Sequence, residues 1–115
     1  MPPELRRVVA YIAGSLASGT ATTSVYSFTE ERHTSISGTL SDAQVILYDH
    51  ERDAHITGSP AGLFHHKLAS HFTVLMKGQS FTGYDFGSDS HYEGAVKGDA
   101  VELYDGREWH HYKLG

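Results

Sequence analysis

Residues 84–91 have the sequence YDFGSDSH, in which a histidine follows an aromatic residue by seven positions. The same spacing occurs at four other places in the chain. The five pairs are Tyr26/His33, Tyr48/His55, Phe64/His71, Tyr84/His91 and Tyr104/His111. If each pair closes a β-hairpin around a two-residue turn, as Gly87-Ser88 would, the aromatic ring and the imidazole face each other on one side of two strands. The spacing therefore predicts a series of similar hairpins. The turn pairs other than Gly87-Ser88 suit a two-residue turn less well, so wider loops are the alternative there.

A longer repeat joins these hairpins into one sheet. Residues 37–49 recur, with changes, as residues 93–105. Between the hairpins lie the turn-prone pairs Ser59-Pro60, Lys77-Gly78 and Lys97-Gly98. A turn centred on each pair would set a histidine opposite the next aromatic residue. The region from residue 20 onward therefore predicts an antiparallel up-and-down meander of about ten strands.

Successive side chains of a strand point to opposite faces of the sheet, so the residues between the Tyr/His positions form an inward face. Its members are Val45, Leu47, Ile56, Phe72, Val74, Met76, Tyr92, Val96, Val101, Leu103, Tyr112 and Leu114. Asp49, Asp85 and Asp105 share that face at the turn end of three hairpins. Because a buried carboxylate needs hydrogen-bond donors, we expect these aspartates to cap the turns through backbone N–H groups.

Residues 3–18 predict an amphipathic helix that docks one face onto the sheet. The apolar stripe is formed by Leu5, Val8, Val9, Ile12 and Leu16. Pro2 and Pro3 suit the start of a helix and Gly19 its end. A short signal peptide after Arg6-Arg7 is the alternative interpretation of this segment.

These observations predict a mainly β, single domain over residues 1–115. The sheet is expected to curl around the helix as a half-barrel or a closed barrel. Whether the sheet closes depends on strand stagger, which no local pattern determines.

Composition limits the partners and the compartment. The 115 residues include no cysteine, and nine histidines equal the nine Lys plus Arg. The formal net charge of -5 excludes a constitutively basic nucleic-acid binder at neutral pH. No apolar run approaches the roughly 20 residues that span a bilayer. The lack of cysteine favours a cytoplasmic protein, with secretion left open.

The segments Phe81–Gly94 and Val101–Asp105 resemble units of small bacterial repeat proteins built from Tyr-Asp-aromatic-Gly and Ser-His-aromatic-x-Gly motifs. The resemblance covers most of residues 20–115. It implies a hairpin-built fold and a bacterial origin, and it transfers no functional residue. The chain departs from the pattern at His50, His66 and Gly106, each of which replaces an aromatic residue of the motif.

The outer face is the first candidate site. Its predicted ligand-binding or interface residues are Tyr48, His55, Phe64, His71, Tyr84, Phe86, His91, Tyr104, Trp109 and His111. One interpretation is that cross-strand ring pairs only stabilise a solvent-facing sheet. The other is that so many rings are covered, either by a second copy of the chain or by a glycan or small ligand, since like rings two strands apart are spaced by about 10 Å. This interpretation predicts a non-enzymatic binding or self-association module.

A metal site is the alternative functional hypothesis. The inferred registers place His50, Asp53 and His66 side by side on consecutive strands, with His55 one step along from Asp53. Two imidazoles and a carboxylate at neighbouring strand positions suit a divalent transition metal such as zinc.

Enzyme signatures are otherwise missing from the sequence. The chain has no phosphate-binding loop, no dinucleotide-binding fingerprint, no nucleophile elbow and no cysteine nucleophile. We therefore expect neither catalytic residues nor a cofactor, apart from the metal of the alternative hypothesis.

Overall fold

The computed structural model describes residues 1–19 and 22–115. Residues 20 and 21, where the predicted hairpin region begins, lie outside the described residues. The elements in chain order are α1 (Pro3–Ser18), β1 (Ser24–Ser27), β2 (Arg32–Leu40), β3 (Val45–Asp49), β4 (Ala54–Ser59), β5 (Gly62–His65), β6 (Ser70–Phe72), β7 (Leu75–Lys77), β8 (Ser80–Asp85), β9 (Ser90–Lys97), β10 (Ala100–Tyr104) and β11 (Trp109–Leu114). Among the described residues, no helix is long and apolar enough to cross a bilayer.

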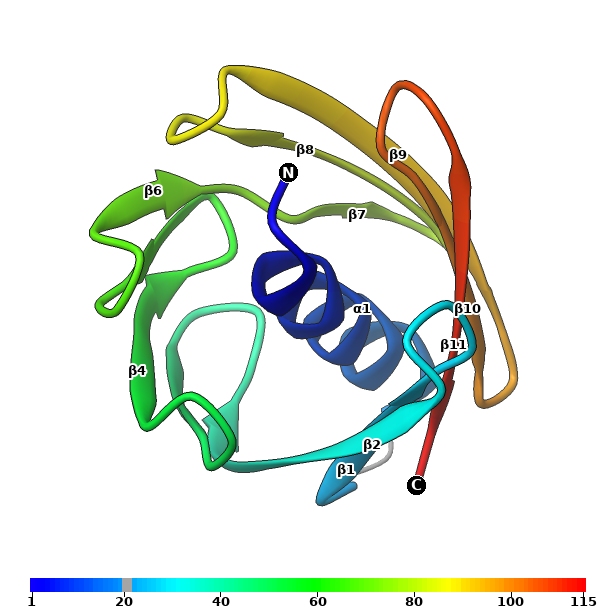
Figure 1. Ribbon diagram of the computed structural model, residues 1–115, viewed down its shortest axis with the longest axis horizontal. Helices are drawn as coiled ribbons and strands as arrows, with labels where there is room; N and C mark the ends of the chain where they lie inside the picture. Colours follow the sequence, from blue (N-terminus) through cyan, green and yellow to red (C-terminus); the bar gives the residue numbers. More distant parts are fainter. Residues whose placement is uncertain (20–21) are drawn as a thin grey trace.

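The strands form a closed antiparallel barrel of ten strands with β7 outside it. Strands β1 to β6 follow one another around the wall, β1 pairs with β11, and β11 to β8 complete the wall. The pair Phe72↔Asp85 closes the barrel between β6 and β8. Strands β6 and β7 both derive from the single strand predicted before the Lys77-Gly78 turn. The predicted meander around one N-terminal helix is therefore confirmed, and the sheet closes (Figure 1).

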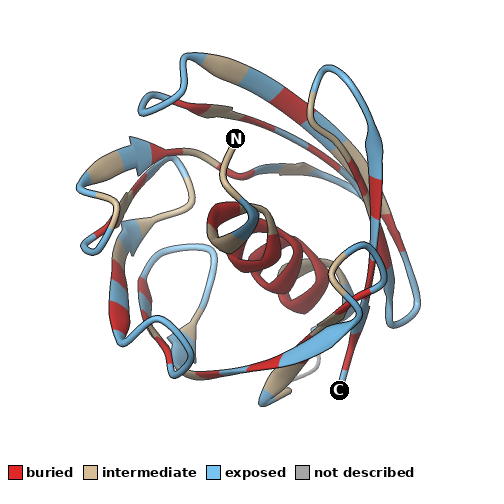
Figure 2. Cartoon of the chain, in the orientation of Figure 1, coloured by how far each residue is buried: buried red, intermediate tan, exposed pale blue. Residues whose placement is uncertain are grey.

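Helix α1 runs through the inside of the barrel (Figure 1). The prediction that the helix docks one face is wrong, because its buried residues lie on all sides (Figure 2). Ala10 and Gly14 lie opposite the predicted stripe and are buried. A Cβ on Gly14 would come within 2.5 Å of the Leu114 Cδ1 atom, so the helix and β11 approach closely there. The predicted helix end is confirmed, since Gly19 has φ 68° and its N–H donates to the Ser15 carbonyl.

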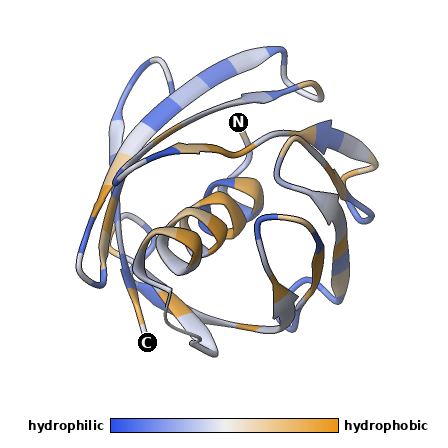
Figure 3. Cartoon of the chain, turned by 180° about the vertical axis from the view of Figure 1, so that it is seen from behind, coloured by the Kyte–Doolittle hydropathy of each residue, from blue (hydrophilic) through white to orange (hydrophobic). Residues whose placement is uncertain are grey.

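The strands alternate between the helix and solvent, as the sequence predicted. Figure 3 shows apolar and polar positions alternating along strands that surround a mostly apolar helix. The buried members of the predicted inward face are Val45, Leu47, Ile56, Phe72, Val74, Tyr92, Val96, Val101, Leu103, Tyr112 and Leu114, and Met76 is half-buried against them. The core is therefore the helix together with one face of the surrounding sheet.

In each hairpin, the residue that follows the first aromatic residue points inward and caps the hairpin loop. Asp49 accepts hydrogen bonds from the backbone N–H groups of Glu51 and Arg52 at 2.9 and 3.1 Å. Asp85 accepts from the N–H group of Gly87, and Asp105 accepts from the N–H groups of Arg107 and Glu108, which confirms the predicted capping role. Ser27 and His65 hold the equivalent positions, and the Ser27 hydroxyl accepts from the N–H of Glu30. All five hairpins therefore use one kind of rim contact.

The hairpin loops are longer than the predicted two-residue turns. Asp49 pairs with Ala54, which leaves a loop of residues 50–53. The loop ends on Asp53 with φ 52°, and Glu31, Ala69 and Asp89 have similar positive φ values in their own hairpins. A residue of left-handed conformation after a turn is common in hairpin loops of three to five residues. The capped loop replaces the primed turn and leaves the strand register of these four hairpins unchanged.

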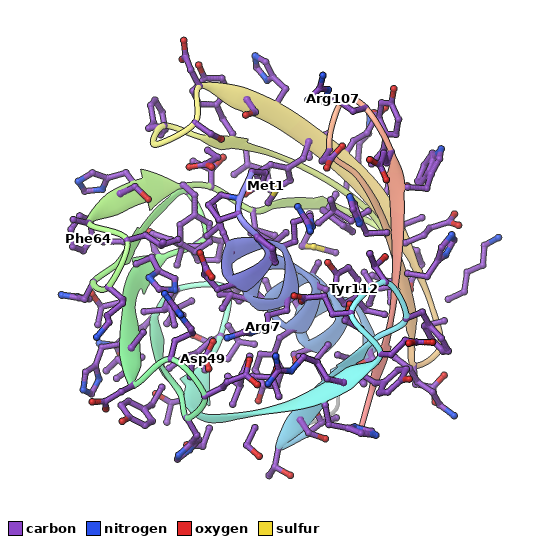
Figure 4. All side chains as sticks on the ribbon, viewed as in Figure 1. Met1, Arg7, Asp49, Phe64, Arg107 and Tyr112 are labelled. Atoms are coloured by element: carbon purple, nitrogen blue, oxygen red, sulfur yellow. The ribbon has the colours of Figure 1, made fainter. Side chains whose placement is uncertain are left out.

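A buried ion pair joins the helix to the barrel wall. The Arg7 guanidinium donates to Asp49 Oδ2 from Nη2 at 2.8 Å and from Nε at 3.1 Å. Its Nη1 atom lies 2.8 Å from Glu51. In Figure 4, Arg7 and Asp49 point toward each other inside the barrel. Because Asp49 also caps its loop, the carboxylate is satisfied from both sides, as a buried charge requires.

His65 is the one imidazole in this set of five loop caps. Its Nδ1 atom accepts from the N–H of Leu68 at 3.1 Å, so the ring is neutral and its proton is on Nε2. Burial lowers the pKa of His65; the carboxylates of Asp49 and Glu4 act against this, and the cations Arg7 and Arg52 add to it. Protonation would remove the acceptor of the Leu68 N–H group.

Ala10→Gln tests whether the barrel encloses the helix. Gln has nearly the helix propensity of Ala, so the main effect is overpacking and burial of an amide in the barrel. We expect the free energy of unfolding, measured by urea denaturation, to fall by about 1–3 kcal/mol or more. Ala17→Gln is the control, since Ala17 lies on the same side of the helix near its half-buried end. Equal effects at the two positions would indicate a helix that docks with one face only.

His65→Asn tests the neutral cap. Because the folded pKa of His65 lies below the unfolded value of about 6.5, the unfolded chain binds more protons between the two values, and stability falls as pH falls through that range. Asn keeps an acceptor for the Leu68 N–H and does not titrate. Urea denaturation at several pH values from 7.5 to 5 should show a steeper loss of unfolding free energy in the wild type than in the variant. Parallel curves would contradict a neutral buried His65.

Candidate functional site

Rings from all five hairpins encircle the outside of the barrel. We call this set the ring belt: Tyr26, Phe28, His33, Tyr48, His50, His55, Phe64, His66, His71, Tyr84, Phe86, His91, Tyr104, Trp109 and His111. Each member is exposed or half-buried. Figure 4 labels Phe64, whose side chain points away from the barrel. The belt contains every residue of the predicted ligand-binding or interface set.

Rings within one hairpin contact one another. Tyr84 pairs with His91, and the ring centroids are 4.5 Å apart. Tyr84 also meets Phe86 at 4.7 Å in an edge contact. Tyr26↔His33, Tyr48↔His55 and Phe64↔His71 are paired in the same way. Four of the five predicted aromatic/His pairs are therefore confirmed, and each hairpin holds its rings in fixed positions.

The fifth predicted pair, Tyr104 with His111, is wrong. Tyr104 pairs with Trp109, at a centroid distance of 5.2 Å, and His111 pairs with Glu102. Gly106 in the loop has φ 96°, a conformation that favours glycine. The loop therefore turns around Gly106 and Arg107, one residue earlier than predicted.

The registers between hairpins differ from the prediction by two residues. Phe64 faces Thr57 rather than His55, and Tyr104 faces Glu93 rather than His91. At Lys97-Gly98 the turn is centred on Gly98-Asp99, because a primed turn needs positive φ at its first central residue and Gly98 has φ 63°. A two-residue shift keeps every side chain on its face. The belt is consequently staggered, and it does not form the level row predicted.

The two sides of the belt have different chemistry. Directly after β3 and β5, His50 Nε2 lies 2.7 Å from the Ser37 hydroxyl, and His66 Nε2 lies 2.9 Å from the Thr57 hydroxyl. On the opposite side, the equivalent rings are Phe28 and Phe86, with 56% and 61% of their surfaces exposed, and Trp109 is 52% exposed. The side from β8 through β11 to β1 therefore carries the exposed apolar rings.

The structure does not bring the predicted metal ligands together. His50 is bonded to Ser37 and His66 to Thr57, while Asp53 accepts a hydrogen bond from the Tyr48 hydroxyl. The predicted pairing of Asp53 with His66 is wrong, since His66 donates its N–H to the carbonyl of His55. Among residues 1–19 and 22–115, no group of three His, Cys, Asp or Glu side chains is arranged to hold a metal ion.

A groove of about 490 Å³ lies on the outer face over β7 to β10. Its walls form two rows across the sheet: Thr73, Tyr84, His91 and Gly106 in one, and Leu75, Thr82, Glu93 and Tyr104 in the other. The side chains of Thr73 and Thr82 are small, and Gly106 lies at the position where the four other hairpins have a ring that contacts their first aromatic residue. The groove is therefore a gap in the ring belt beside Tyr84 and Tyr104.

The strand break between β6 and β7 forms the floor of the groove. Thr73 donates its N–H to the Tyr84 carbonyl, and its hydroxyl accepts from the Tyr84 N–H at 3.0 Å. The Tyr92 hydroxyl donates to the Thr73 carbonyl. Burial raises the pKa of Tyr92, so its phenol stays neutral and keeps this bond. A Cβ on Gly83 would come within 2.1 Å of the Thr73 carbonyl oxygen, so only glycine allows this approach.

Sequence reasoning found the rings of the groove but not the groove itself. Tyr84, His91 and Tyr104 were predicted as ligand-binding residues, whereas Thr73, Leu75, Thr82 and Glu93 were not. The departure of Gly106 from the hairpin pattern was the available signal, because a missing ring leaves a space in a row of rings.

No family model, curated protein or solved structure matches this chain. The resemblance to bacterial repeat proteins therefore stays a prediction. The groove and the ring belt are the features of the structure that bear on function.

Gly83→Ala tests the floor of the groove. Because the added methyl group meets the Thr73 carbonyl and the Tyr92 ring, strands β6 and β8 must separate where the barrel closes. We expect the free energy of unfolding to fall by about 1–3 kcal/mol in urea denaturation. Gly62→Ala is the control, since its Cβ would meet nothing within 4 Å, and it should be neutral or slightly stabilising. A neutral Gly83→Ala would contradict this closure of the barrel.

Proposed function

We propose that this chain is a non-enzymatic binding module and that the groove over β7 to β10 is its ligand site. The observation that carries the proposal is the gap in the ring belt, where two tyrosine rings flank an open space of about 490 Å³. Small-molecule sites are typically concave and mostly apolar, with a few polar groups that orient the ligand. The groove has this composition, with Glu93, His91 and Thr82 as its polar groups.

The exposed aromatic rings lie on the same side of the barrel as the groove, which supports a ligand site there. Phe86, directly after β8, contacts Tyr84, and Trp109 on β11 contacts Tyr104. By contrast, His50 and His66 use their Nε2 atoms in hydrogen bonds to neighbouring strands. Apolar rings left in water are favourable contact surfaces for a partner. A ligand in the groove would therefore find further ring surface at its edges.

Self-association is the second candidate function of this side. Phe28, Phe86 and Trp109 are each more than half exposed, and a two-fold dimer would bring such rings against their symmetry mates. A dimer of this kind would cover the groove as well. An experiment that fills the groove therefore distinguishes ligand binding from self-association.

Thr82→Trp fills the groove with an indole while keeping a residue that suits a strand. Ligand-observed NMR with a library of small aromatic and polyol fragments should detect binding to the wild type and a loss of at least about tenfold in affinity for the variant. Thr39→Trp is the control, since Thr39 is exposed on β2. It should bind as the wild type does.

Two results would contradict ligand binding in the groove. One is the absence of any fragment or other probe ligand whose binding Thr82→Trp weakens. The other is a dimer in sedimentation velocity that Thr82→Trp disrupts while no fragment binds, which would assign this side to self-association instead.

A further inference from the structure

Two tyrosine rings border the groove at positions that one small ring cannot contact together. Tyr84 is on β8 and Tyr104 on β10, with β9 between them. Strands two apart are separated by about 10 Å. Because Tyr84 pairs with His91 and Tyr104 with Glu93, the two rings are also displaced along the strands. A ligand that covers both tyrosines is therefore longer than a single six-membered ring.

Both rings are held in place before any ligand binds. Tyr84 contacts Phe86 and His91 at centroid distances of 4.7 and 4.5 Å, and its hydroxyl donates to Asp89. Tyr104 contacts Trp109 at 5.2 Å. Rings that are already fixed lose little conformational freedom on binding, so their contact area contributes more fully to affinity.

Polar side chains lie between the two rings. His91 and Glu93 are two residues apart on the outer face of β9, and Thr82 on the neighbouring strand β8 pairs with Glu93. An imidazole, a carboxylate and a hydroxyl together donate and accept hydrogen bonds. The groove thus alternates apolar faces with hydrogen-bonding groups, an arrangement complementary to a molecule with flat apolar faces and hydroxyl groups at its edges.

The charges of the groove exclude anionic ligands. Its described lining residues include Glu93 and neither Lys nor Arg, so a phosphate, sulfate or carboxylate would meet no cation of complementary charge. A small organic cation is the competing class, because Tyr104 and Glu93 face each other and suit an ammonium group. Such a cation would leave Tyr84, His91 and Thr82 without a role.

We infer that the ligand is a neutral saccharide of more than one sugar ring, which stacks on Tyr84 and Tyr104 and hydrogen-bonds to His91 and Glu93 between them. The inference rests on the ligand site proposed above. It uses both tyrosine rings and the polar side chains of His91 and Glu93. The open outer side leaves the remaining hydroxyl groups in water.

Titration of the ¹⁵N-labelled chain with cellohexaose, chitohexaose and maltohexaose tests this inference. At least one of the three should shift the amide signals of Thr82, Tyr84, His91, Glu93 and Tyr104. Tyr84→Ser and Tyr104→Ser should each raise Kd at least about fivefold, and the matched control Tyr48→Ser, on the other side of the belt, should change it less than about twofold. The amide spectrum outside the groove verifies that each variant is folded, and Thr82→Trp replaces any that is not.

Titration with tetramethylammonium and the Glu93→Gln variant distinguish a saccharide ligand from an organic cation, the competing ligand class. Gln still accepts a hydrogen bond, so saccharide binding should weaken less than about fivefold, whereas a cation would lose its counter-charge. Groove binding of tetramethylammonium that Glu93→Gln abolishes, without any hexasaccharide binding, would overturn the saccharide inference and leave the ligand site intact. An equal loss in Tyr48→Ser would also overturn it. The proposed function itself fails only if neither these probes nor the fragments bind the groove.

Discussion

The structure depends on the burial of one helix on all of its sides. Leu5, Val8 and Ile12 lie on one side of α1 and Ala10 lies on the opposite side, and none of them has exposed surface. Small residues such as Gly14 let strands come close to the helix, and the Arg7 guanidinium donates a hydrogen bond to Asp49 at the rim of the barrel. The inward face of the strands is thus committed to packing, and burial of this apolar surface provides the main driving force for folding. Any recognition of a partner in this account uses the outer face.

The outer face follows from the hairpin repeat, and its differences from the repeat give it a site. In four hairpins an aromatic residue faces a histidine, with a further ring two residues after the first. Cross-strand ring pairs of this kind stabilise a sheet by about 0.2–1 kcal/mol each. The repeat therefore has a structural role wherever it is complete. The fifth hairpin has Gly106 in place of a ring, and the wall beside it breaks between β6 and β7, so the groove lies where two irregularities meet.

Much of this architecture could be predicted from the sequence, because hairpin registers and strand faces are local properties. The seven-residue spacing gave the pairs from Tyr26 to His91, and alternation gave the inward side chains. The turns between hairpins were misplaced by one residue because the pattern does not say that Gly98 must be the first central residue of its turn. The one-sided helix was a wrong prediction, because it depended on the stripe of large apolar residues alone, whereas Ala10 and Gly14 outside that stripe are small enough to pack against strands. The metal hypothesis depended on a misplaced turn. The groove depends on a strand break at Thr73, which the hydrophobic periodicity of the sequence does not indicate.

The most direct test of this account is a measurement of contacts between a bound saccharide and the protein. Isotope-filtered nuclear Overhauser spectra of the labelled chain with the tightest-binding hexasaccharide would report which side chains touch the sugar. If the saccharide stacks on both rings, cross-peaks will connect sugar C–H protons to the ring protons of both Tyr84 and Tyr104. Cross-peaks confined to the rings of Tyr48 and Phe64, or no cross-peaks at saturating ligand, would contradict it.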